Sequence, residues 1–132
     1  MRGVLAIAAA SIVLSGCGRA VAAAPDSRNP AHCIAALSMA QAWNDADKSS
    51  RHPEYSAQYR AIATYEIEKV RKSGGSVDAT IKEAVAFNHA YNKDPRVVEV
   101  LVACLKAAAQ DPNLRPLVPR PLLNDGQSST GH

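Results

Sequence analysis

Three cysteines, Cys17, Cys33 and Cys104, are the side chains of this 132-residue sequence with the most reactive chemistry. A cysteine can carry a lipid, act as a nucleophile or metal ligand, or form a disulfide. None of the three belongs to a C-x-x-C or C-x-x-C-H arrangement, which are the spacings of thioredoxin-like redox sites and of covalently attached haem. The spacing gives no support to a redox site or to a haem cofactor.

The first 17 residues have the organisation of an export signal. Arg2 precedes an apolar run of about 11 residues, which is too short for the roughly 20 that a membrane-spanning helix needs. The run ends in Leu-Ser-Gly-Cys at residues 14–17, and here the sequence resembles bacterial lipoproteins, in which a leucine and two small residues precede the acylated cysteine. The resemblance implies that residues 1–16 are removed and that Cys17, carrying a diacylglycerol, becomes the first residue.

A lipid on Cys17 would place the mature domain in the bacterial cell envelope, facing the periplasm. Gly18 stands where inner-membrane retention uses aspartate, so the resemblance favours the outer membrane. A second route stays open, because Ala20-Val21-Ala22 has the small-x-small pattern of ordinary signal peptidase. Cleavage after Ala22 would remove Cys17 and give a soluble periplasmic or secreted protein.

Either export route leaves two thiols, Cys33 and Cys104, in an oxidising compartment, where such a pair becomes a disulfide. The closed loop of about 70 residues would contribute about 4 kcal/mol in the chain-entropy model. Aromatic residues make up only 5 % of the chain, so its core can bury little apolar surface per residue. The disulfide is therefore expected to decide stability rather than function.

Other chemical groups do not form a recognisable catalytic or metal site. The four histidines lack the spacing of a zinc motif and are expected at the surface or at helix caps: His32, His52, His89 and His132. Asp45 and Asp47 begin like a calcium loop, but Ser50 replaces the required glycine and Ser56 the bidentate glutamate. No serine lies in a G-x-S-x-G turn. The sequence predicts no enzyme, no metal and no cofactor.

The aromatic residues Trp43, Tyr55, Tyr59 and Tyr65 allow two interpretations. They can fill the core and its edge, or they can form an exposed patch that binds a partner protein. The formal net charge is only +3, from 15 basic and 12 acidic residues that are evenly spread, which argues against a nucleic-acid partner.

The elements that position these residues are predicted to be four antiparallel helices in a small bundle-like, all-α domain. Pro30 and Pro53 begin the first two helices, which end near residue 44 and at Gly74-Gly75. Ser76 caps a third helix that ends near residue 92, and Asp94-Pro95 begins a fourth that ends near residue 110. Cys33 and Cys104 fall on apolar stripes of the first and last helices. The predicted inner face of the third helix comprises Val77, Ile81, Ala84, Val85 and Asn88.

The predicted organisation is a signal peptide at 1–16, a flexible lipidated tether at 17–29, a helical domain at 30–112 and a tail at 113–132. Three prolines in the first part of the tail favour an extended chain, and the polar, glycine- and serine-rich end favours disorder. One alternative remains, because five apolar residues could place the tail in a groove between helices: Leu114, Leu117, Val118, Leu122 and Leu123.

The expected function is that of a tethered, non-enzymatic envelope protein that binds another envelope protein or has a structural role. The alternative is a periplasmic chaperone or an inhibitor-like soluble factor. The layout of one disulfide, few aromatic residues and a small helical domain is similar to that of periplasmic acid-stress chaperones, which is an analogy of fold alone.

Overall fold

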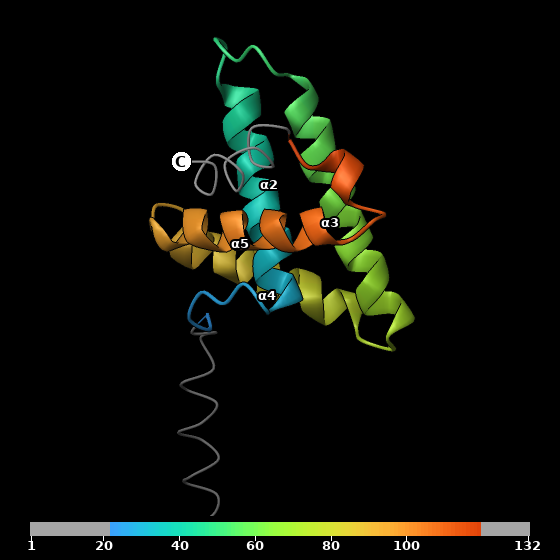
Figure 1. Ribbon diagram of the computed structural model, residues 1–132. Helices are drawn as coiled ribbons and strands as arrows, with labels where there is room; N and C mark the ends of the chain where they lie inside the picture. Colours follow the sequence, from blue (N-terminus) through green and yellow to red (C-terminus); the bar gives the residue numbers. More distant parts are fainter. Residues whose placement is uncertain (1–21, 120–132) are drawn as a thin grey trace, which may run out of the picture.

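The computed structural model of the protein describes residues 22–119 (Figure 1). Within that range the chain forms four α-helices, a short 3-10 helix and no strand, which confirms the predicted all-α class. The elements are α2 (Pro30–Ala46), α3 (Glu54–Lys72), α4 (Val77–Tyr91), α5 (Arg96–Gln110) and η1 (Arg115–Leu117). The predictions for Cys17, for the signal peptide and for Leu122 and Leu123 concern residues outside this range.

The helix ends follow from capping residues that the sequence already displays. The Asn29 side chain accepts a hydrogen bond from the Ala31 N–H at 2.9 Å, and the Ser76 hydroxyl accepts one from the Ala79 N–H at 3.1 Å. Such bonds satisfy backbone donors that have no partner inside the helix. Gly74 follows α3 with φ of +81°, a left-handed conformation that is cheap only for glycine.

Helix α2 is the centre of the domain and contacts the other three helices. Helix α3 runs antiparallel beside it, whereas α4 and α5 run across it (Figure 1). The prediction of four antiparallel helices is therefore wrong for α4 and α5. The physical reason lies in α2, where small side chains let other helices approach from several sides. Its fully or nearly fully buried alanines are Ala31, Ala35, Ala36 and Ala40.

The core has two parts along α2. Around the first half of α2, Phe87 of α4 and Val97 of α5 are fully buried together with the alanines and both disulfide cysteines. A second cluster joins Leu37 of α2 to Ile62 of α3 and Leu105 of α5. The first half of α2 is buried on nearly all sides, so this helix lacks a simple polar face.

The inner face of α4 differs from the predicted one. Ala84 and Phe87 are buried, whereas Val85 is 49 % exposed and Ile81 is 36 % exposed. Helix α4 crosses α2 and makes few contacts with α3, so only one flank of its broad apolar arc is covered. Helical periodicity locates such an arc but not the flank that a crossing helix covers.

The folded domain extends beyond both predicted boundaries. After α5 the chain turns back, and Leu114 and Val118 enter the second core cluster with only 1 % and 3 % exposure. The prediction of a tail beginning at residue 113 is thus wrong for residues 113–119. At the other end, the Asn29 N–H donates to the Asp26 carbonyl at 3.1 Å, so the predicted flexible tether is already folded at residues 26–29.

Enlarging a buried alanine of α2 should show how close the crossing helices lie. Ala35 has no exposed surface, and Ala35→Leu is expected to lower the free energy of unfolding by about 1–3 kcal/mol because the added methyl groups have no space. Ala42→Leu is the matched control, since Ala42 is exposed on the same helix. Urea denaturation measures both variants, and equal stability of the two would contradict the close packing.

Candidate partner-binding tip and the groove beside the disulfide

The disulfide joins α2 to α5 where these helices cross. The Cα atoms of Cys33 and Cys104 are 5.8 Å apart, well within the reach of a disulfide, and the sulfur atoms are bonded. The predicted pairing between the first and last helices is confirmed. The two residues are 8 % and 6 % exposed, so the bond lies at the edge of the core rather than in its centre.

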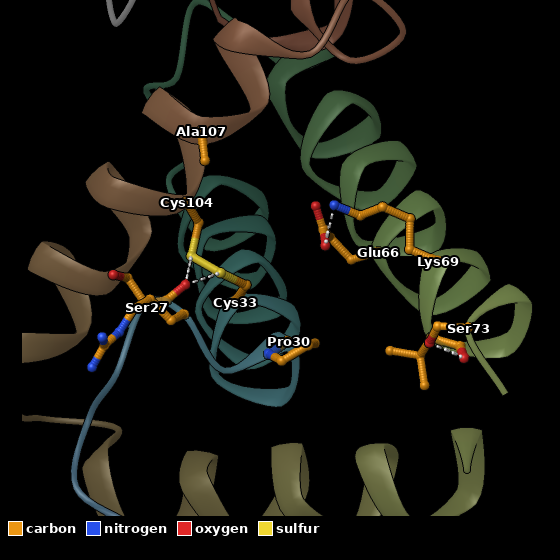
Figure 2. A pocket seen from close by; sticks show the side chains of 10 residues that line it. Ser27, Pro30, Cys33, Glu66, Lys69, Ser73, Cys104 and Ala107 are labelled. Atoms are coloured by element: carbon orange, nitrogen blue, oxygen red, sulfur yellow. Dashed lines mark hydrogen bonds and ion pairs between the residues drawn. A yellow bond between two sulfur atoms is a disulfide. The ribbon is translucent and has the colours of Figure 1, made fainter. Parts of the chain in front are cut away.

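One side of the disulfide is covered by the chain that precedes α2. The Ser27 carbonyl oxygen lies 3.2 Å from Cys33 Sγ and 3.8 Å from Cys104 Sγ (Figure 2). These contacts are not hydrogen bonds, because a disulfide sulfur carries no hydrogen. The Arg28 N–H donates to the Asp26 carboxylate at 2.9 Å, which holds this turn and keeps the pKa of Asp26 below its ordinary value.

A groove of about 380 Å³ opens between the disulfide and α3 (Figure 2). On the α3 side, Lys69 Nζ lies 3.0 Å from Glu66 Oε2, so these two charges compensate each other. The Ser73 hydroxyl donates to the Val70 carbonyl at 2.9 Å. These polar groups are occupied by local partners within α3, and none of them is positioned as a base beside a nucleophile.

The three predicted tyrosines of α3 have two different surroundings. His52 stacks on Tyr55 with ring centroids 4.5 Å apart, and Tyr55 meets the edge of Tyr59 at 6.4 Å. Partial burial in the second core cluster raises the pKa of Tyr59. The three rings of His52, Tyr55 and Tyr59 form an aromatic row. Tyr65 is not part of it, because it lies nearer the C-terminal end of α3, where its hydroxyl accepts a hydrogen bond from Asn113 Nδ2 at 3.2 Å.

Trp43 belongs to the same end of the domain as the aromatic row. It lies in the last turn of α2, it is the only tryptophan of the chain, and it is 45 % exposed. We call residues 43–59 the α2–α3 tip. Tyr59 and Tyr65 support the core, as the first interpretation expects, whereas Trp43 and His52 are exposed and Tyr55 is partly exposed. Binding of a partner by these residues stays a prediction.

Side-chain hydrogen bonds fix the loop of the tip. Asn44 Nδ2 donates to Ser56 Oγ at 2.8 Å, and the Ser56 hydroxyl donates to the Asp45 carboxylate. The Ser49 hydroxyl donates to Asp47 at 2.6 Å and lowers the pKa of that carboxyl group. A loop held in this way fixes the two helix ends that carry Trp43 and Tyr55, so these side chains are presented at a small entropic cost for binding.

His32 is a fully buried polar group, although the histidines were expected at the surface or at helix caps. It has no exposed area and packs against the Phe87 ring with centroids 4.5 Å apart. Nδ1 accepts a hydrogen bond from the Asp26 N–H at 3.0 Å, while Nε2 lies 3.6 Å from Glu83 Oε1 and has no hydrogen-bond partner. The available signal was its position inside the otherwise apolar run 31–37.

The described part of the chain, residues 22–119, contains no helix with the length and apolar character to cross a bilayer. Over the same range, no three His, Cys, Asp or Glu side chains are grouped so that they could bind a metal ion. No protein-family model, curated protein or solved structure matches this chain.

Proposed function

We propose that the protein is a lipid-anchored component of the bacterial cell envelope that acts by binding another envelope protein, not by catalysis. The lipoprotein-like segment at residues 14–17 supports the anchor. The α2–α3 tip supports the binding role, and its accessible aromatic residues are the observation that carries the proposal. Aromatic side chains are enriched in the centres of protein interfaces because they bury a large area with few rotatable bonds.

The position of the tip suits this role. Helix α2 has 17 residues and is therefore about 25 Å long. The chain enters the domain at one end of α2, and the tip lies at the other end (Figure 1). A partner could reach Trp43 and Tyr55 without displacing the segment that leads to the proposed anchor.

Photocrosslinking from the tip tests the binding role. A photoreactive phenylalanine analogue at position 43 is expected to give one discrete adduct in intact cells. The same analogue at Val85, an equally exposed apolar position on α4, is expected to give none. With the purified partner, Tyr55→Ala should weaken binding by about tenfold, because a central aromatic side chain commonly contributes more than 1 kcal/mol. Equal adducts from both positions, or none from position 43, would contradict the proposal.

An acid-responsive chaperone is a second candidate, and the Asp26 carboxylate, which holds the turn before α2, favours it. The pKa of Asp26 is lowered by the Arg28 N–H, so this carboxylate stabilises the fold above its ordinary pKa of about 4, and the contribution is lost as the pH falls below it.

A chaperone of this kind should expose apolar surface in acid while its helices persist. Binding of a fluorescent apolar dye and far-ultraviolet circular dichroism, both recorded from pH 7 to pH 3, measure the two properties. Asp26→Asn is the matched control, because it retains the side-chain oxygen but does not titrate. Cooperative loss of helix without a dye-binding intermediate would exclude this candidate.

A further inference from the structure

The first described residue, Ala22, lies close to the end of α4. The Ala22 carbonyl oxygen accepts a hydrogen bond from the Tyr91 hydroxyl at 3.4 Å, and Tyr91 is the last residue of α4. From there the chain passes the start of α5, where Pro25 and Ser27 line one shallow groove together with Arg96, Glu99 and Val100. The N-terminal segment therefore enters beside the turn that joins α4 to α5.

The distance from the proposed anchor to this entry point is short. Cys17 and Ala22 are five residues apart, and an extended chain spans at most about 3.5 Å per residue, or about 17 Å in total. Helix α2, which separates the entry point from the tip, is about 25 Å long. A tether of this length cannot hold the tip against the bilayer while the entry point faces away from it.

The surface around the entry point has the chemistry of a membrane-facing surface. Lys93 is exposed and belongs to none of the ion pairs found among residues 22–119. Val98, in the first turn of α5, is 50 % exposed. Arg96 is bound to Asp94 at 2.8 Å and lies over the Tyr91 ring at 5.4 Å. A cation without an ion-pair partner and an exposed apolar side chain at the start of α5 suit the interface of a bilayer that contains anionic lipid.

We propose that the α4–α5 turn, with Lys93 and Val98, faces the bilayer surface and that the α2–α3 tip points away from it. This inference rests on the lipid anchor of the proposed function but not on its protein partner. The lipid supplies the affinity for the membrane, and the entry point and the short tether supply the orientation. The tip is then held roughly the length of α2 from the membrane, where a soluble domain of another protein can reach it.

Fluorescence quenching by lipid tests the orientation. The full chain, produced with its lipid, is reconstituted in phosphatidylcholine–phosphatidylglycerol vesicles whose headgroups carry a spin label. Three variants, Lys93→Cys, Val98→Cys and Lys48→Cys, are each labelled with a fluorophore without reductant, so that the native disulfide remains. Lys48 is the matched control, because it is an exposed lysine in the tip. We expect strong loss of fluorescence at positions 93 and 98 and little at position 48.

The outcomes separate the orientation from the anchor. Protein that floats with the vesicles but is quenched equally at positions 93 and 48, or more at 48, would overturn the orientation and leave the anchor intact. Protein that does not float with the vesicles would overturn the anchor and the orientation together. The labelled Cys17→Ala variants should show no quenching at any position, which confirms that the signal depends on tethering.

Discussion

Replacing both Cys33 and Cys104 with alanine is expected to lower the free energy of unfolding by about 2–5 kcal/mol. The two residues are 71 positions apart, so the disulfide closes most of the described domain into one loop and restricts the unfolded chain strongly. In the chain-entropy model such a loop contributes about 4 kcal/mol. Since small domains are stable by only about 5–15 kcal/mol, this is a large part of the total.

Denaturation in guanidinium chloride, followed by circular dichroism, measures this loss. Reduced wild-type protein is the control and should behave like the double variant. Partner binding through the tip should survive reduction under conditions in which the helices persist, because the disulfide lies at the α2–α5 crossing and not in the tip. A double variant as stable as the wild type would show that the disulfide does not hold the domain. Loss of binding with intact helices would instead point to a redox role.

Removing the buried leucine of the C-terminal segment should lower the free energy of unfolding by about as much as removing the disulfide. Leu114 is 1 % exposed in the second core cluster, and Leu114→Ala is expected to lower the free energy of unfolding by about 2–5 kcal/mol. Truncation after Asn113 should lower the free energy of unfolding further, because it also removes Val118 from that cluster. Both proteins can be compared with the wild type by thermal unfolding.

Leu117→Ala is the matched control for this segment. Leu117 lies in η1, only partly buried at the edge of the same cluster, and its replacement should have a clearly smaller effect. A truncated protein with an unchanged melting temperature would show that residues 114–119 are not part of the cooperative unit.

The features that were predicted correctly from the sequence depend on local signals. Capping residues act through their own backbone neighbours. The helix ends could therefore be predicted to within a few residues from Asn29, Ser76 and Gly74. The disulfide was predictable because the expected export would leave two thiols in an oxidising compartment. Each of these predictions needed no knowledge of how the helices cross.

The errors concern contacts between distant parts of the chain. The exposure of Val85 depends on the direction in which α4 crosses α2, and no periodicity encodes that direction. The prolines at 116 and 119 suggested an extended tail, but Pro116 fits the 3-10 turn and Leu114 finds a place in the core. His32 is buried because residues 26–29 fold back to supply its hydrogen-bond donor.

The candidate site was predictable in composition but not in arrangement. Tyr55 and Tyr59 are four residues apart, so their contact follows from helical spacing. Tyr65 is ten residues beyond Tyr55, or about 15 Å along α3, and it packs against the second core cluster and bonds to Asn113. The exposure of Trp43 depends on how far α2 extends past the crossing helices, which only the tertiary structure determines.

The intact mass of the mature protein, isolated from the envelope without reductant, tests the central proposal most directly. We expect a polypeptide that begins at Cys17, carries the mass of its lipid and lacks the two thiol hydrogens of Cys33 and Cys104. Cys17→Ala should abolish the lipid and release the protein from the membrane fraction. A wild-type chain that begins at Ala23 without lipid would contradict the anchor, and with it the membrane-facing role of the α4–α5 turn.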